Sequence, residues 1–294
     1  ARMRKLRARI SHNDSAHRYK SLGVDVYIGE ARFTDAETVE VAGPAGNRTL
    51  RFAKAAICTG ARASAPPIPG LSETGYLTNE TVFSLMELPA RLAVIGAGPI
   101  GCELAQAFAR FGSQVYLIEA LHGMMPNEDR DAAQIVQQSL LRDGVQLLCC
   151  GKDLRVANRE SGKRLTVDSH GQRYDVMVDE ILVGAGRTPN VEGLGLERVG
   201  VEYDKTGVTV NGRLQTTNPR IFAAGDICSK YKFTHAADAM AQIVIQNALF
   251  PHPLGLAYAN VDSLIMPWCT FTEPEIAHVG LYEADAKAQG LDVE

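Results

Sequence analysis

The 294-residue sequence predicts an α/β fold in which one domain is inserted into another. The first observation is a βαβ pattern, in which an apolar strand over 92–95 runs into a glycine turn, a helix over 100–111 and a second apolar strand over 114–118. The second observation is that short apolar strands with glycine turns also occur on both sides of this unit. The flanking segments have to pair with each other in order to fold, which is typical of a domain split by an insertion.

Composition limits the classes of partner. The chain has 30 basic and 34 acidic side chains and a formal charge of −4, which gives no support to nucleic acid or to an anionic membrane as a partner. No apolar run approaches the ~20 residues that a membrane-spanning helix needs. The six cysteines have neither a disulfide-framework spacing nor a metal-ligand spacing, so we expect a reducing, cytoplasmic setting and no metal site.

The segment before the glycine turn opens with a predicted helix over 1–20 that ends near Gly23. Because this helix begins without a start signal, we expect further sequence to precede it. Short antiparallel strands are predicted next, over 24–28, 31–33, 38–41 and 49–52. A buried strand over 54–58 then leads through a glycine turn to a proline-rich, extended connection over 65–70.

The glycine turn itself carries the strongest functional signal. Gly96, Gly98 and Gly101 have the G-x-G-x-x-G spacing of a dinucleotide-binding turn, in which the second glycine lets a pyrophosphate approach the backbone. The helix that follows offers free N–H groups to a phosphate. Glu119 ends the next strand, at about the distance where such folds hold the ribose hydroxyls. We therefore predict a Rossmann-like dinucleotide domain, the alternative being a structural βαβ unit without a ligand.

A second group of candidate residues follows the predicted insert. The short buried strand over 221–224 ends at Gly225 and Asp226, and a small-residue helix begins near Thr234. An aspartate at the carboxyl end of a strand can accept a hydrogen bond from a hydroxyl-rich cofactor, although a Gly-Asp pair alone is more often a surface turn. The helix N-terminus favours negative charge.

Four segments resemble the pyridine nucleotide-disulfide oxidoreductases in their order and spacing. Their residues are most similar to those of the mercuric reductase-like branch. These segments are 58–61, 94–103, 184–190 and 223–226. The resemblance implies an FAD domain split by an NAD(P) domain, followed by a C-terminal interface domain that forms a homodimer. The corresponding boundaries are 1–89 for the first part of the FAD domain, 90–207 for the NAD(P) domain, 208–258 for the second FAD part and 259–294 for the start of the interface domain.

The resemblance also implies roles for individual residues. Gly96, Gly98 and Gly101 would hold the nicotinamide dinucleotide pyrophosphate, and Glu103 would act as the catalytic residue near the nicotinamide carboxamide. The implied FAD-binding residues are Thr59, Gly60, Arg187, Gly225, Asp226, Thr234, His235 and Ala236, and Gly186 would be a further cofactor-binding residue. Glu119 would accept the two ribose hydroxyls of NADH and repel a 2′-phosphate, and no arginine follows it closely in sequence. We therefore expect NADH to be preferred over NADPH.

The sequence also departs from the family pattern. The redox pair Cys-x-x-x-x-Cys and the upstream ADP-binding glycine turn are not in this sequence, and the chain stops before the region of the family's catalytic His-Glu pair. His278 is expected to be a structural histidine. The vicinal pair Cys149 and Cys150 ends a predicted strand, where cysteine acts as a small hydrophobic residue.

Two functions remain open at this point. The first is a fragment of an FAD-dependent oxidoreductase that passes hydride from NADH to the flavin and two electrons onward to a disulfide or metal-ion acceptor, without full turnover by this chain alone. The alternative is a non-catalytic dinucleotide-binding module.

Overall fold

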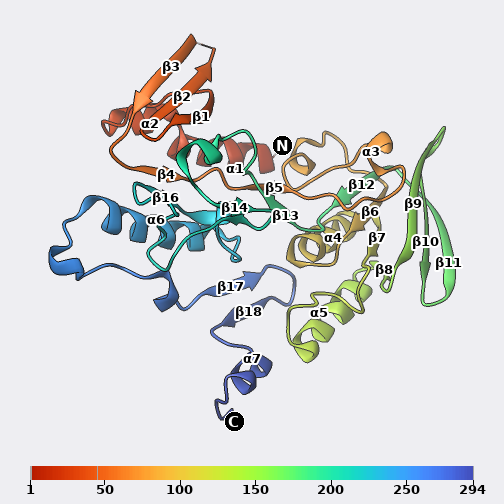
Figure 1. Cartoon of the computed structure of the whole chain (residues 1–294). Helices are drawn as coiled ribbons and strands as arrows, with labels where there is room; N and C mark the ends of the chain where they lie inside the picture. Colours follow the sequence, from red (N-terminus) through yellow and green to blue (C-terminus); the bar gives the residue numbers. More distant parts are fainter. Residues whose placement is uncertain (1, 45, 294) are drawn as a thin grey trace.

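A parallel four-stranded sheet forms the core of the inserted unit, in the right half of the view in Figure 1. The structure is a computed structural model, and it describes residues 2–44 and 46–293. The strand order is β12-β6-β7-β8, and all neighbours are parallel. The bounds are Arg91–Ile95 for β6, Gln114–Ile118 for β7, Gln146–Leu148 for β8 and Glu180–Val183 for β12.

Alternation along β6 assigns the two faces of this sheet. Leu92 and Val94 belong to the apolar core that includes buried residues of helices α4 (Pro99–Phe111) and α5 (Arg130–Arg142). Ala93 and Ile95 point to the opposite core, which contains residues of the antiparallel sheet β11-β10-β9. A strand covered on both sides has to be apolar throughout, which is the pattern in the sequence. The bounds are Lys152–Arg159 for β9, Gly162–Ser169 for β10 and Gln172–Val178 for β11.

The flanking segments pair across the insertion, as the sequence predicts. Strand β4 (Ala55–Ile57) lies parallel to β16 (Ile221–Ala223), more than a hundred and sixty residues later in the chain. Strand β5 (Ala61–Ala63) is antiparallel to β13 (Arg187–Pro189). Helix α6 (Thr234–Leu249) packs beside β16. The insertion of one α/β unit into another is therefore confirmed.

The N-terminal region differs from the expectation in two places. The single helix predicted over 1–20 is wrong, because α1 (Arg2–Ser11) and α2 (Ala16–Ser21) are separate helices. The side chain of Ser15 accepts a hydrogen bond from the backbone N–H of Arg18 at 3.2 Å and so begins a new helix. The strand predicted over 24–28 is also wrong, since those residues pair with no strand within the described part of the chain.

The three-stranded sheet β1-β2-β3 follows, with antiparallel pairing as predicted. Its strands are Glu30–Asp35, Thr38–Gly43 and Gly46–Arg51. At the other end of the chain, β17 (Pro267–Thr270) and β18 (Ile276–Val279) form a hairpin that is followed by α7 (Glu283–Ala288). Residue 45 of the first hairpin lies outside the described residues.

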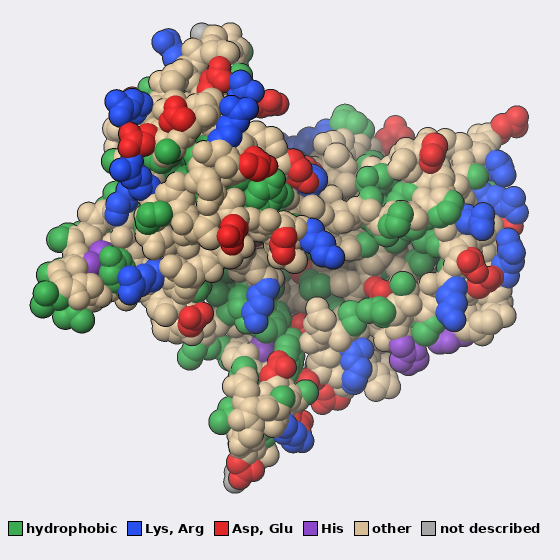
Figure 2. Space-filling model, in the orientation of Figure 1, with side chains coloured by type: hydrophobic (Ala, Val, Ile, Leu, Met, Phe, Trp, Pro, Cys, Tyr) green, Lys and Arg blue, Asp and Glu red, His purple; other side chains and the backbone are tan. Residues whose placement is uncertain are grey.

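The other elements are short. They are helix α3 (Leu71–Thr74), strands β14 (Tyr203–Asp204) and β15 (Gly207–Val208), and the 3-10 helices His12–Asp14, Val82–Ser84, Leu196–Val199, Gly225–Ile227, Pro253–Gly255 and Val261–Ser263. Basic and acidic side chains are intermixed on the face shown in Figure 2, in agreement with the nearly balanced charge. A search of the described residues finds no helix with the length and apolar character to cross a membrane.

Candidate functional site

The glycine turn between β6 and α4 is built by close backbone packing at two of its three glycines. A Cβ on Gly96, whose φ is +101°, would lie 2.8 Å from the carbonyl carbon of Gly184. A Cβ on Gly101 would lie 1.9 Å from the carbonyl oxygen of Gly96. Gly98 is different, because a Cβ there would have no neighbour within 4 Å among the described residues. The structure thus needs Gly96 and Gly101 for packing, and it leaves open space beside Gly98.

Helix α4 begins at this open position. Gly98 is the N-cap residue, and no side chain caps the helix there. Pro99 occupies the first turn, where its missing N–H costs no hydrogen bond. The first-turn amides are therefore available to an anion that approaches Gly98, and the helix dipole adds to the attraction.

The carboxylate of Glu119 lies across the turn. One oxygen, Oε2, accepts a hydrogen bond from the backbone N–H of Ala97 at 2.8 Å, and the other, Oε1, accepts one from the N–H of Leu121 at 3.0 Å. Both contacts hold the acid at the carboxyl end of β7, next to the glycine turn. This is the edge at which open α/β sheets bind ligands.

Gly96, Gly98 and Glu119 line one cleft of about 1430 Å³. The residues expected from the sequence that line it are Gly96, Gly98, Glu103, Glu119, Gly186 and Arg187. Those that do not are Thr59, Gly60, Gly101, Gly225, Asp226, Thr234, His235 and Ala236. Both the predicted catalytic residue and the predicted ribose-binding acid thus face the same space as the open glycine.

A backbone amide from the C-terminal region of the chain holds the side chain of Glu103. Its Oε1 accepts a hydrogen bond from the backbone N–H of Phe271 at 2.9 Å, although the two residues are far apart in sequence. The side chain comes from the first turns of α4 and is partly buried. The contact fixes a carboxylate a little more than one helical turn beyond Gly98.

Arg187, at the start of β13, and Asp226, in the turn after β16, join two of the flanking segments. Arg187 Nη2 donates to the carbonyl of Ala61 at 2.6 Å, and its Nε lies 3.0 Å from Asp226 Oδ2. The second contact is an ion pair without hydrogen-bond geometry, and the buried Nε has no hydrogen-bond partner in the described part of the chain. Both side chains are largely covered, with 26% and 16% exposure, so solvent screens their attraction only in part.

The expected FAD residues form two smaller groups. Thr59 donates its hydroxyl to the carbonyl of Asn190 at 3.0 Å, and the Asn190 amide donates to the carbonyl of Thr59 at 2.9 Å. Gly60 has a φ of +67°, and its carbonyl accepts the N–H of Asn190. Gly225 has a φ of +82°, and a Cβ on it would lie 3.2 Å from the Cβ of Ala237. Both strand-end turns thus have backbone conformations that suit glycine.

The N-terminus of α6 leaves its backbone amides free of side-chain caps. Thr234 and His235 are exposed, whereas Ala236 is fully buried. The imidazole of His235 stacks on Phe233 and its Nε2 lies 2.6 Å from the carbonyl oxygen of Pro267. The His235 side chain is therefore engaged with the C-terminal hairpin, and its backbone N–H is the group left for a ligand. The uncapped helix end and the two glycine turns fit part of an FAD molecule.

One group in the cleft was not foreseen from the sequence. Glu128, which is only 8% exposed, accepts hydrogen bonds from Trp268 Nε1 at 3.0 Å and from the Tyr282 hydroxyl at 2.9 Å. Burial, followed by the bond to Glu128, raises the pKa of Tyr282 well above its ordinary value. No local motif marks these three residues, because the contacts join positions about 140 and 154 apart in the chain.

Comparison with known proteins agrees with these features. The family model of pyridine nucleotide-disulphide oxidoreductases matches residues 7–241. Mercuric reductase of Staphylococcus aureus is 37% identical over 273 residues, which are 92% of this chain and 48% of that protein. Dihydrolipoyl dehydrogenase of Geobacillus stearothermophilus is 33% identical over 272 residues, or 92% of this chain and 56% of that protein. The chain thus spans about half the length of these relatives.

A solved structure leads to the same family. The Cu(II) complex of the flavoprotein disulfide reductase RclA from Escherichia coli matches with a TM-score of 0.81 and 32% identity, covering 91% of this chain and 59% of that one. Membership of one family therefore explains three features together: the inserted α/β unit, the glycine turn and the paired flanking strands. The chain belongs to the pyridine nucleotide-disulphide oxidoreductase family.

Proposed function

We propose that this chain binds a nicotinamide dinucleotide at the glycine turn and delivers its hydride toward an FAD held partly by the flanking unit. The observation that carries the proposal is the open space beside Gly98, in the same cleft as Glu103 and Glu119. A pyrophosphate on the α4 N-terminus would extend the ribose of one nucleotide toward Glu119 and the nicotinamide toward Glu103. Arg187 lines this cleft and contacts Asp226 of the flanking unit.

We propose NADH as the preferred dinucleotide. The carboxylate of Glu119 can accept hydrogen bonds from both ribose hydroxyls, and its charge repels a 2′-phosphate. Its present bonds to the N–H groups of Ala97 and Leu121 hold it at the required edge of the sheet. Arg155 also lines the cleft. If Arg155 bound the 2′-phosphate of NADPH, its removal would weaken NADPH binding selectively.

Glu103 is proposed to orient the nicotinamide ring through its carboxamide. The bond from the Phe271 N–H leaves the second carboxylate oxygen free to accept an amide N–H. When bound, FAD supplies the hydride acceptor of the reaction. The flanking residues would bind it through the backbone amides of Thr234, His235 and Ala236 and through Asp226, while the Gly186 turn brings Arg187 close.

The acceptor beyond the flavin is proposed to be a disulfide or a metal ion, as the names of the mercuric reductase and dihydrolipoyl dehydrogenase relatives suggest. We propose a cytoplasmic homodimer for the intact protein. Large apolar side chains of the C-terminal region are exposed, and these support a subunit interface there, namely Leu249, Leu254, Ile265, Phe271 and Val279. Full turnover is not expected of this chain, because no Cys-x-x-x-x-Cys pair is in its sequence.

The reductive step can be tested without the final acceptor. The purified chain is mixed anaerobically with excess FAD and NADH, and flavin absorbance is followed against the same mixture without protein. We expect faster bleaching with the chain, and a loss of that acceleration in Gly98→Ala. Equal rates with and without the chain, together with normal NADH binding, would favour the non-catalytic dinucleotide module instead. FAD bound in stoichiometric amount after purification would overturn the view that the flanking residues hold only part of it.

A further inference from the structure

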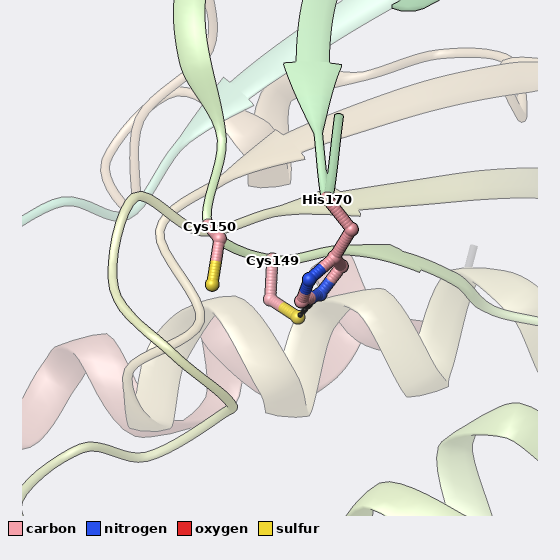
Figure 3. Close-up of side chains that lie close together, drawn as sticks. All are labelled: Cys149, Cys150 and His170. Carbon is pink, nitrogen blue, oxygen red and sulfur yellow. Dashed lines mark hydrogen bonds between the residues drawn. The ribbon is translucent and has the colours of Figure 1, made fainter. Parts of the chain in front are cut away.

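A cluster of sulfur and nitrogen donors lies at the end of β8, outside the dinucleotide cleft. Cys149 and Cys150 directly follow this strand, and His170 projects toward them from the turn between β10 and β11 (Figure 3). The Cys149 Sγ lies 3.0 Å from His170 Nε2. One donor atom from each of the three residues lies within 4.8 Å of the others.

A fourth donor lies beside this group. Nδ1 of His122 is 3.4 Å from the Sγ of Cys150, and the rings of His122 and His170 have centroids 6.1 Å apart. Both histidines are exposed, and both cysteines are partly exposed. Histidine side chains are visible at the surface on the β8 to β11 side of the molecule (Figure 2). The two thiols are thus not buried in apolar packing, as the sequence suggests they would be.

The backbone holds the three contributing segments together. The N–H of Cys150 donates to the carbonyl of Leu121 at 3.0 Å, which brings the segment of His122 to the end of β8. The hydroxyl of the buried Ser169 donates to the carbonyl of Cys149 at 2.5 Å, which brings the hairpin turn to the same place. The donors are therefore brought together by the fold rather than by chance rotation of surface side chains.

The hairpin turn adds a second constraint on His170. Ser169 pairs with Gln172, so the loop contains only His170 and Gly171, with φ values of +49° and +76°. Positive φ at both central residues is the conformation of a type I′ turn, for which Asn is preferred over histidine at the first position. This turn points the His170 imidazole at Cys149 (Figure 3).

The chemistry of the donors selects the kind of cation. Two thiolates with imidazole nitrogens form a soft to borderline set, which suits tetrahedral Zn²⁺ and not Mg²⁺ or Ca²⁺, whose ligands are oxygens. We propose that Cys149, Cys150 and His170 bind one Zn²⁺ ion, with His122 as the fourth ligand. Binding displaces the thiol protons into solvent.

This site is distinct from the dinucleotide cleft. None of its four side chains lines that cleft, and a failure of NADH binding would not affect the test described below. The ion would join the segment after β7, the end of β8 and the β10 to β11 turn. A metal that binds the folded chain and not the unfolded one raises the melting temperature as its concentration increases.

The test uses the full chain, reduced and freed of metal with a chelator that is then removed. Zn²⁺ alone is titrated in competition with a chromophoric indicator, and Co²⁺ is added separately as a spectroscopic probe. We expect one equivalent of Zn²⁺, a higher melting temperature, and with Co²⁺ a thiolate charge-transfer band together with tetrahedral d–d bands. The absence of the thiolate band at one equivalent of Co²⁺ would overturn the proposal.

Variants identify the ligands. Cys149→Ser and Cys150→Ser should each weaken Zn²⁺ binding by ~100-fold or more, since loss of an outer-shell partner alone costs about 10–100-fold. His170→Asn keeps both thiols and suits the turn, so it should weaken binding by ~10-fold or more without lowering the melting temperature of the metal-free chain. His122→Asn should also weaken binding.

Matched controls use a cysteine and a histidine elsewhere, Cys58→Ser and His17→Asn, which are both exposed and should bind as the wild type does. Wild-type affinity in Cys149→Ser or in His170→Asn would overturn the site. Wild-type affinity in His122→Asn would overturn the assignment of the fourth ligand. Loss of binding in either control would show that the ion lies elsewhere, and it would overturn the proposal as well.

Discussion

The backbone N–H of Ala97 donates to the carboxylate of Glu119 at 2.8 Å. The acid that follows β7 is therefore bonded to the turn that leads into α4. The bond joins the two elements that a dinucleotide has to bridge. Hydroxyls of a bound ribose would compete for the same carboxylate oxygens. Cofactor choice should therefore depend on this one side chain more than on any other in the cleft.

Replacing Glu119 with arginine tests that relation. Glu119→Arg removes the acceptor of the ribose hydroxyls and places a guanidinium where a 2′-phosphate would lie. We expect the ratio of NADPH to NADH affinity to rise by at least ~10-fold, or about 1.4 kcal/mol. Arg155→Ala is the control, because it removes an arginine that already lines the cleft. If Arg155→Ala weakened NADPH binding selectively while Glu119→Arg changed nothing, the role assigned to Glu119 would be wrong.

The glycine turn offers a matched pair of alanine substitutions. Gly98→Ala adds a methyl group to open space, so the melting temperature should stay close to that of the wild type while dinucleotide binding weakens by ~10-fold or more. Gly101→Ala places its Cβ 1.9 Å from the carbonyl oxygen of Gly96, and overpacking of this kind costs ~1–3 kcal/mol or more. Denaturant unfolding and NADH titration of both variants measure the difference. Equal effects of the two substitutions on stability would contradict this geometry.

The contact between Arg91 and Asp179 gives a prediction on pH. Asp179 accepts hydrogen bonds from the guanidinium and from the backbone N–H of Arg91, and the side-chain bond lowers the pKa of this carboxyl below its ordinary value. Because the pKa is lower in the folded state, the contact stabilises the fold at pH values above the unfolded-state pKa of ~3.9. This stabilisation is lost as the pH falls through the lower pKa of the folded state.

Asp179→Asn should therefore cost about 1 kcal/mol at neutral pH, a modest figure because both side chains are about one-third exposed. The difference from the wild type should shrink as the solution is acidified through the carboxyl range. Denaturant unfolding at several pH values measures it. The opposite trend, with a difference that grows on acidification, would be inconsistent with a lowered pKa.

The ion pair of Arg187 and Asp226 predicts energetic coupling between β13 and the turn after β16. Each single substitution, Arg187→Met or Asp226→Asn, leaves the other charge largely buried without its partner. We expect the double variant to be less destabilised than the sum of the single variants, with a coupling of ~0.5–3 kcal/mol. A double-mutant cycle on the free energy of unfolding measures this value. Strict additivity would show that the two side chains are not coupled energetically.

The sequence predicted the features that depend on local pattern. The alternation of glycines and apolar runs placed β6, α4 and β7, and the need to cover the flanks predicted the pairing of β4 with β16. The glycine turn could be predicted because close backbone packing requires glycine there, since Gly101 has no room for a side chain. Such constraints act within a few residues, so they leave a pattern in the sequence.

Other features could not be predicted because they arise from tertiary contacts. Glu128 meets Trp268 and Tyr282 only after the C-terminal hairpin folds against the inserted unit. The thiol of Cys149 meets His170 only through a hairpin whose register has to be known first. The break at Ser15 was a missed local signal, because serine is a preferred N-cap residue.

Binding of NADH to the purified chain, followed by fluorescence of Trp268, tests the central claim most directly. Trp268 is the single tryptophan of the sequence, and it lines the cleft. The account predicts saturable quenching by NADH at one equivalent per chain, an affinity for NADPH weaker by ~10-fold, and weaker quenching affinity in Gly98→Ala. The absence of saturable quenching by NADH, or equal affinity in Gly98→Ala, would contradict the assignment of the glycine turn as the dinucleotide site.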